Sequence, residues 1–269
     1  MSVGHYENFP VGSLLMPARW RRAVHVVYRF ARSADDLADE GDALPTARLA
    51  ALAAYHSELV RIGTHETPHI PLFIELAQVI AQYSLSLDLF HDLLRAFEQD
   101  VVQTRYADAA QVLAYCRGSA NPVGRILLGI FGMQDEQSLA QSDAICSALQ
   151  LINFLQDVAI DYAKGRIYLP QDQLARFGVD EAQIARADSG GTWAALMDAE
   201  IARARALLDA GAPLGRTLRG RVGVELRLII AGGDTILHKL ERVRGDVFRQ
   251  RPRLCRWDWV KMLSRALCA

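Results

Sequence analysis

The sequence predicts an all-α protein that forms a single helical domain over residues 1–269. Three observations predict this fold class. Apolar residues recur at spacings of three and four along almost the whole chain. Proline and glycine gather in short breaks between these stretches. No segment shows a sustained alternating pattern typical of a strand, and no repeat or low-complexity linker divides the chain, so one domain is the simplest interpretation.

The breaks fix where each helix begins and ends. They lie at residues 41–45, 63–71, 118–124, 132, 165–170, 178, 189–192 and 211–220. Residues 166–170 are expected to be a short extended loop, and the long stretch 136–164 is rich in Ala, Ile and Leu, which indicates a core helix. In chain order, we expect helices over residues 17–40, 46–61, 71–83, 86–103, 108–117, 120–132, 136–164, 171–176, 180–186, 192–210, 217–244 and 256–267.

Composition excludes several classes of protein. The formal net charge is −1, so nothing indicates nucleic acid as a partner. None of the four cysteines has the spacing of a zinc site, which is typical of reduced thiols in a cytoplasmic protein. We expect no signal peptide and no transmembrane helix. The basic C-terminus, with Trp257 and Trp259, leaves two interpretations open: a solvated last helix, or peripheral contact with anionic lipid at the inner membrane face.

Two aspartate clusters carry the chemistry. Asp35 and Asp39 lie four residues apart, as do Asn153, Asp157 and Asp161 in turn, so each set shares one helix face. Carboxylates stacked in this way repel one another and are costly to bury. Mg²⁺ removes that cost, and it prefers a few carboxylates together with substrate phosphates. An acidic pair on a helix is usually a solvated face, but two such sets together predict a magnesium–diphosphate site lining a cavity.

Neighbouring residues extend this site. Arg32 shares the face of Asp35 and suits bidentate binding of diphosphate. Tyr28, one turn earlier, is either a core aromatic or part of the site. Lys164 and Arg166 follow the second cluster directly, which is electrostatically ordinary for a helix C-terminus and equally suits a loop that closes over a leaving group. A dinucleotide fingerprint, a P-loop and a nucleophile elbow are all absent from the sequence.

Several segments together resemble the squalene/phytoene synthase family, over nearly the whole chain. They are HYENF (residues 5–9), YRFARSADDLAD (28–39), Asp100 with Arg105 and Tyr106, YCRGSANPVG (115–124), and NFLQDVAID (153–161) followed by GRIYLP (165–170). The resemblance implies an isoprenoid-synthase helical bundle with a central, apolar active-site cavity. Phe9, Phe30 and Phe154 are either liners of that cavity or ordinary core aromatics.

The resemblance also implies roles for particular residues. The Mg²⁺ ligands are expected to be Asp35, Asp39, Asn153, Asp157 and Asp161. The four aspartates and Tyr115 are expected to be catalytic. The residues expected to contact the isoprenoid diphosphate substrate are His5, Phe9, Tyr28, Arg32, Asn153, Gln156, Lys164, Arg166 and Tyr168.

Two departures from the family pattern point to one branch. Gln156 stands where the family usually has arginine, directly before the aspartate of the second motif, and the segment 115–124 also differs. With the ending VFRQRPRLCRWDW (247–259), these features look like the bacterial branch that serves the hopanoid-associated route to squalene. We interpret Gln156 as lying beside the metal-binding face, where a neutral amide tunes the site to one diphosphate and a captured water.

The expected reaction is that of this branch, in which presqualene diphosphate and water give hydroxysqualene and diphosphate with Mg²⁺ and without NADPH. Two alternatives remain. One is a synthase that condenses two prenyl diphosphates to presqualene diphosphate, squalene or phytoene. The other is a non-catalytic helical assembly factor of the same fold, against which the intact aspartates argue. The expected partners are the isoprenoid diphosphate substrate and other enzymes of squalene synthesis, with which this protein would exchange substrate and product.

Overall fold

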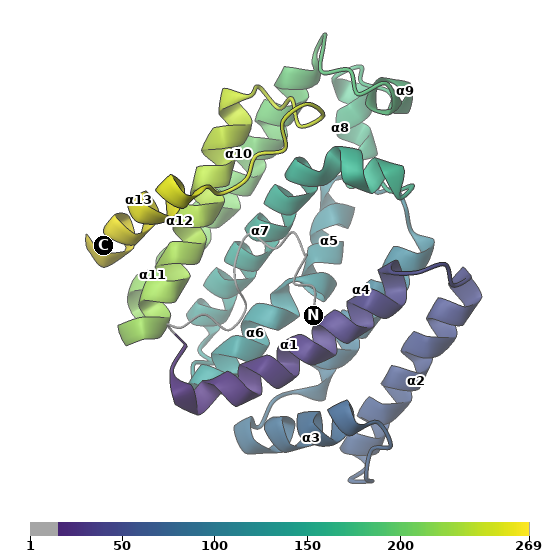
Figure 1. Cartoon of the computed structure of the whole chain (residues 1–269), viewed down its shortest axis with the longest axis vertical. Coiled ribbons are helices and arrows are strands. Elements are labelled where there is room, and N and C mark those ends of the chain that lie inside the picture. The colour runs from purple at the N-terminus through teal and green to yellow at the C-terminus, as the bar shows by residue number, and fades with distance from the viewer. Residues whose placement is uncertain (1–15, 269) are drawn as a thin grey trace.

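The computed structural model describes residues 16–268 and is all-α, as predicted. Its helices follow one another with short connections, and α7 runs through the middle of the molecule (Figure 1). In chain order they are α1 (Ala18–Asp39), α2 (Pro45–Gly63), α3 (Pro71–Tyr83), α4 (Leu87–Val102), α5 (Ala109–Ser119), α6 (Asn121–Phe131), α7 (Glu136–Ala163), α8 (Gln171–Arg176), α9 (Glu181–Ala185), α10 (Trp193–Gly211), α11 (Leu214–Thr217), α12 (Gly220–Arg242) and α13 (Arg256–Cys268).

The N-terminal helices α1 to α4 pack with α6 around one apolar cluster. Phe30 lies at its centre, fully buried, and meets the rings of Phe73 and Phe90 edge-on at centroid distances of 5.6 and 5.5 Å. Such edge-to-face contacts add to the burial of apolar area. Phe30 is therefore a core aromatic, and the alternative that it lines a substrate cavity is not the one observed.

A second apolar cluster joins α5, α7, α10 and α12. Trp193 is fully buried there, and its indole Nε1 donates a hydrogen bond to the Gly245 carbonyl at 2.8 Å. Helices α7 and α10 approach closely, since a Cβ atom at Gly211 would stand 2.6 Å from the Gln141 carbonyl oxygen. This packing explains why α7 is buried over much of its length and holds its polar residues in fixed places.

Residues 166–170 form the extended loop that the sequence predicts, directly after the turn at Lys164 and Gly165 that ends α7. The Ile167 amide donates to the Thr104 carbonyl at 3.0 Å, and Ile167 forms an isolated parallel bridge with Arg105. The Arg105 guanidinium fixes the start of the loop by donating to the Gly165 carbonyl at 2.7 Å, while it pairs with Glu181 at 2.7 Å. The loop is thus tied to the connection that follows α4 and to α9.

The predicted break at 211–220 contains one structural element that was not expected. The single turn α11 forms there because Leu214 and Leu218 are buried in a third small apolar cluster, which the spacing of glycines does not reveal. The other expected helices are confirmed to within a few residues at each end.

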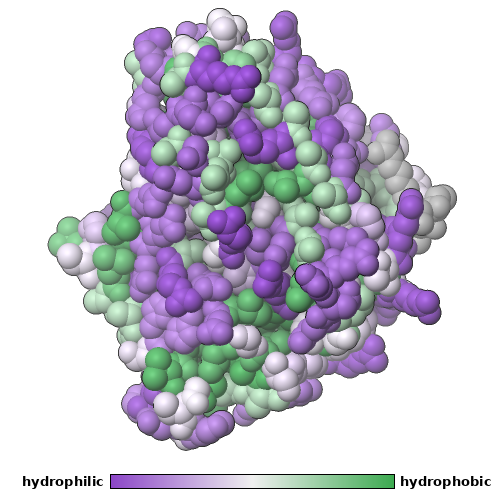
Figure 2. Space-filling view, turned by 180° about the vertical axis from the view of Figure 1, so that it is seen from behind, coloured by the Kyte–Doolittle hydropathy of each residue, from purple (hydrophilic) through white to green (hydrophobic). Residues whose placement is uncertain are grey.

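The back of the molecule is mostly hydrophilic, with hydrophobic side chains showing in scattered patches between charged ones (Figure 2). At the outer side of the bundle, α13 exposes Trp257, Val260 and Leu263. None of the helices that the structure describes combines the length and the apolar character needed to cross a membrane.

Candidate active site

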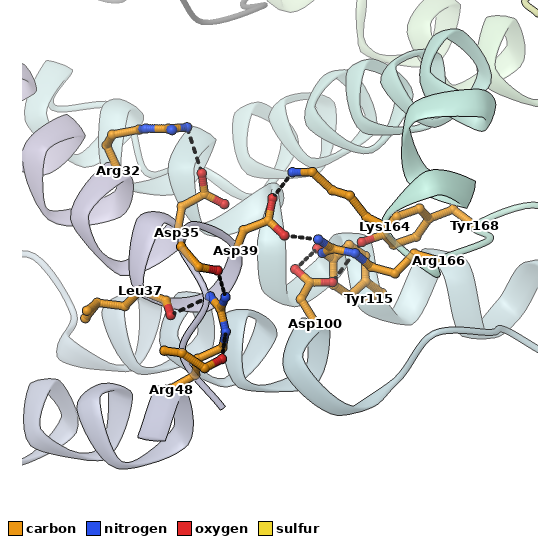
Figure 3. A network of polar contacts seen from close by, with 12 residues as sticks. Arg32, Asp35, Leu37, Asp39, Arg48, Asp100, Tyr115, Lys164, Arg166 and Tyr168 are labelled. Carbon is orange, nitrogen blue, oxygen red and sulfur yellow. Dashed lines mark hydrogen bonds and ion pairs between the residues drawn. The ribbon is translucent and has the colours of Figure 1, made fainter. Parts of the chain in front are cut away.

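The last turns of α1 present the first aspartate cluster. The Arg32 guanidinium donates to the Asp35 carboxylate at 2.8 Å (Figure 3). It also pairs with Asp36 at 2.6 Å. Asp39 points the other way, toward the loop after α7, where its carboxylate pairs with both Lys164 and Arg166. The first cluster and the cationic loop therefore lie side by side in the structure.

Asp39 is held in place by a clamp at the end of α1. Arg48 of α2 donates to the carbonyls of Leu37, Gly41 and Ala43 at 3.2, 2.6 and 3.0 Å (Figure 3). Leu37 lies in the last turn of α1, where backbone acceptors lack helical partners, and Gly41 and Ala43 lie in the connection to α2. A cation there also complements the helix dipole. The clamp fixes the turn that carries Asp39, and no sequence pattern predicted this role for Arg48.

A partly buried carboxyl group, Asp100 of α4, lies beneath the loop. It accepts hydrogen bonds from the hydroxyls of Tyr115 and Tyr168 at 2.6 and 2.9 Å (Figure 3). Burial raises the pKa of Asp100 to about 6, against the lowering effect of the two hydroxyls. The Tyr168 ring also stacks on Phe154 with centroids 3.8 Å apart. Tyr115 and Tyr168 were both predicted site residues, whereas Asp100 was noted only as part of the family resemblance.

The second cluster lies on the C-terminal half of α7. Asn153 is exposed, Asp157 is buried, and Asp161 is partly buried. Asp157 forms a two-pronged ion pair with Arg251, whose Nη2 lies 3.0 Å from Oδ2. Asp161 forms no ion pair with any described residue. Burial, followed by repulsion from Asp157, raises the pKa of Asp161 to about 8.

Gln156, next to Asp157 on α7, has a partner that the sequence pattern does not predict. Its side chain is buried, at 2% exposure, and its amide Nε2 donates to the Pro252 carbonyl at 2.7 Å. The amide thus holds the segment between α12 and α13, which also brings Arg251 to Asp157. No local pattern indicates this contact, because the partners lie 96 positions apart. The expected hydrogen bond to water or a phosphate oxygen stays a prediction.

The remaining predicted residues divide into two groups. Tyr28 is partly buried on α1, one turn before Arg32, and Lys164 and Arg166 lie on the loop as described. His5 and Phe9 lie outside the residues that the structure describes, and their roles stay predictions.

Asp100, which belongs to neither cluster, interacts electrostatically with one aspartate of each. Asp35 raises the pKa of Asp100, and Asp100 raises that of Asp161. Within residues 16–268, no three acidic, histidine or cysteine side chains converge as a preformed metal centre. The carboxylates pair with cationic side chains, namely Arg32, Lys164, Arg166 and Arg251. The donors are nevertheless all carboxylate or amide oxygens, as Mg²⁺ prefers. The donor set therefore fits Mg²⁺ in its chemistry.

Comparison with protein families gives a match over most of the chain. The model of the family described as squalene/phytoene synthase matches residues 3–258. Among curated proteins, hydroxysqualene synthase from Rhodopseudomonas palustris is 35% identical over 237 residues, which cover 87% of this chain and 80% of that protein. Hydroxysqualene synthase from Sinorhizobium fredii is 32% identical over 252 residues, which cover 92% of this chain and 83% of that protein. The 15-cis-phytoene synthase of Synechococcus elongatus is 30% identical over 273 residues, which cover 96% of this chain and 87% of that protein.

Solved structures give the same picture of the fold. The crystal structure of squalene synthase HpnC from Alicyclobacillus acidocaldarius superposes with a TM-score of 0.81 at 38% identity, covering 89% of this chain and 90% of that one. A dehydrosqualene synthase solved in complex with a ligand superposes with a TM-score of 0.84 at 22% identity, covering 94% and 88%. The latter likeness bears on the fold alone.

Proposed function

The chain belongs to the squalene/phytoene synthase family, and from that premise we propose that it is a hydroxysqualene synthase. The reaction converts presqualene diphosphate and water into hydroxysqualene, diphosphate and a proton. Two relatives, from Rhodopseudomonas palustris and Sinorhizobium fredii, carry that name at 35% and 32% identity. The neutral Gln156 in place of the motif arginine supports the same branch.

The observation that carries the proposal is the arrangement of charges between α1 and the loop after α7. Lys164 and Arg166 converge on Asp39, while Arg32 holds Asp35 on the same helix. Guanidinium and ammonium groups that bind carboxylates in the free enzyme also bind diphosphate oxygens, which present the same acceptors. The site thus holds cations ready for a leaving group that becomes more negative as its bond breaks.

The chemical step separates charge. The C–O bond of the substrate breaks, and its electron pair leaves with the diphosphate, which Arg32, Lys164 and Arg166 hold in place. The cyclopropylcarbinyl cation left behind rearranges and opens, water adds to the resulting allylic cation, and a proton is lost. The Phe154–Tyr168 stack offers aromatic surface to such a cation. Mg²⁺, which Asp35, Asp39, Asn153, Asp157 and Asp161 would hold, supplies further positive charge to the diphosphate when it is bound.

The test is incubation of the purified protein with presqualene diphosphate and Mg²⁺ in ¹⁸O-labelled water, followed by mass spectrometry. We expect hydroxysqualene carrying one ¹⁸O, formed at the same rate with and without NADPH. A strict NADPH requirement with squalene as the sole product would replace this proposal by a reducing squalene synthase.

A condensing synthase is the second candidate, supported by the 30% identity to 15-cis-phytoene synthase over 96% of the chain. Incubation with a prenyl diphosphate alone separates the two. Presqualene diphosphate or a longer hydrocarbon formed from farnesyl or geranylgeranyl diphosphate would favour condensation. Failure to consume any of these diphosphates would instead support the non-catalytic assembly factor.

We also propose that α13 rests on anionic lipid at the inner face of the membrane. Trp257, Val260 and Leu263 are exposed along one side of this helix, and Arg256 and Lys261 flank them. Apolar side chains with cations beside them match an anionic bilayer surface in both polarity and charge. Substrate and product of the proposed reaction are lipids, so a bilayer also offers the route for hand-over from and to neighbouring enzymes of squalene synthesis.

A further inference from the structure

Residues 245–255, which we call the strap, connect α12 to α13 and pass over the C-terminal half of α7 (Figure 1). Both ends of the strap are fixed. The Gly245 carbonyl accepts from the Trp193 indole at 2.8 Å, and the Arg253 carbonyl accepts from the Lys239 ammonium at 2.7 Å. The middle of the strap is therefore brought to a fixed place on α7.

Two adjacent residues of α7 hold two adjacent residues of the strap. Gln156 donates to the Pro252 carbonyl at 2.7 Å, and Asp157 forms the two-pronged ion pair with Arg251. The side chains of Arg251 and Asp157 are only 11% and 12% exposed, so the guanidinium is presented to the second cluster largely away from solvent. A buried hydrogen bond directly beside a buried ion pair fixes the direction from which the guanidinium arrives.

We propose that Gln156 is a positioning residue whose hydrogen bond to Pro252 sets Arg251 at the second cluster, so that the strap supplies the cation that position 156 lacks. In the family pattern, the arginine of this motif is on the same helix as the aspartates. Here the guanidinium comes from a segment 94 positions later in the chain and reaches the aspartate next to Gln156. The inference rests on the proposed function in one respect, the assignment of diphosphate as the ligand.

Arg251 then has two partners in turn. In the free enzyme its guanidinium is the counterion of Asp157, and it also lowers the pKa of Asp161. A planar fork of donors fits a carboxylate and a phosphate in the same bidentate manner. When diphosphate binds, Arg251 is positioned to turn from Asp157 to a diphosphate oxygen, which leaves the carboxylate for the cation that accompanies the ligand.

The probe is inorganic diphosphate with Mg²⁺, titrated calorimetrically into the full-length protein. Arg251→Gln and Gln156→Leu should each weaken binding by about tenfold or more, as expected for loss of a charge-assisted hydrogen bond. The double variant should bind no more weakly than Arg251→Gln, because both changes act through one guanidinium. Arg249→Gln is the matched control, since this strap arginine is 80% exposed, and it should bind like wild type.

Hydrogen exchange of the strap amides gives a second readout. Gln156→Leu should speed their exchange, whereas Arg251→Lys, which keeps the charge, should retain much of the affinity. Each variant is accepted only with wild-type circular dichroism, and Gln156→Asn replaces Gln156→Leu if the latter does not fold. Faster exchange with unchanged diphosphate affinity would reduce Gln156 to a structural contact and overturn the proposal. Failure of the hydroxysqualene assay, with these binding results intact, would overturn only the proposed reaction.

Discussion

At the scale of single residues, the site is a set of acids matched by cations. Asp39 has two cationic partners, Asp35 and Asp36 share Arg32, and Asp157 has Arg251. Each pairing compensates a carboxylate that would otherwise be costly to remove from water. Asp35, Asp39 and Asp157 are also proposed metal ligands, so a metal ion and these cations compete for the same carboxylate oxygens.

The first prediction compares the contributions of Asp35 and the adjacent Asp36 to turnover. Asp35→Asn should lower turnover by about a hundredfold or more, because it removes a charge directed at the metal and the developing negative charge. Asp36→Asn is the matched control, since Asp36 pairs with the same arginine and is similarly exposed but lies outside the predicted ligand set. Turnover with presqualene diphosphate measures the effect, and circular dichroism confirms the fold. Activity of Asp35→Asn above about a tenth of wild type would remove Asp35 from the site.

The second prediction follows from the raised pKa of Asp161. The folded protein keeps this carboxyl protonated up to about pH 8, while the unfolded chain releases the proton near 3.8. The folded state therefore binds more protons between these values, and the unfolding free energy must fall as pH rises through this window. In EDTA, the thermal midpoint should be lower at pH 8 than at pH 6.

Asp161→Asn is the control for that experiment, because an amide does not titrate. The interval from pH 6 to pH 8 suits the comparison because Asp100 has a pKa of about 6. Its own effect on the pH dependence of stability therefore falls mainly below this interval. The variant should show a smaller change in midpoint over the interval than wild type. Equal slopes in the two proteins would contradict the assignment of a protonated Asp161.

At the scale of elements, the sequence predicted much and missed what depends on distant contacts. Helix positions follow from apolar spacing and from glycine and proline, which are local signals, so almost all were predictable. The turn α11 was missed because burial of Leu214 causes it. The same reason explains Arg48, whose contacts with the end of α1 come from the next helix, and Arg251, which only the strap delivers.

The exposed side of α13 carries the next prediction. Wild-type protein should sediment with vesicles that contain phosphatidylglycerol and much less with pure phosphatidylcholine, because the flanking cations need an anionic surface. Trp257→Ser with Val260→Ser should reduce this binding. Leu44→Ser is the control, as Leu44 is 71% exposed at the start of α2, away from the basic helix. Equal binding to both vesicle types, or no loss in the double variant, would contradict lipid docking through α13.

At the scale of the whole molecule, two apolar clusters support the two aspartate sets. One cluster organises α1 to α4 with α6, and the other organises α5, α7, α10 and α12. The first set therefore belongs to one group of helices and the second set to the other. Lys164 and Arg166 link the groups by pairing with Asp39.

A ligand bound by both groups should stabilise the fold as a unit. Mg²⁺ and diphosphate together should raise the thermal midpoint more than the sum of their separate effects, because each compensates the charge of the other. When the free ligand is at about 100 times its dissociation constant, binding adds about 2.7 kcal/mol to the free energy of unfolding. Differential scanning calorimetry measures it, and Asp35→Asn should show a smaller gain. If the thermal midpoint rises by the same amount in EDTA, diphosphate alone accounts for the stabilisation.

The strap has a consequence for the order in which this protein is made. Asp157 emerges from the ribosome long before Arg251, its partner 94 positions later. A nascent chain therefore exposes α1 to α7 to solvent while the aspartate of the second cluster still lacks its guanidinium. Premature termination just ahead of residue 251 would leave the helices from α1 to α12 encoded and the second cluster unfinished. Translation of the strap is thus the step at which Asp157 receives its guanidinium partner.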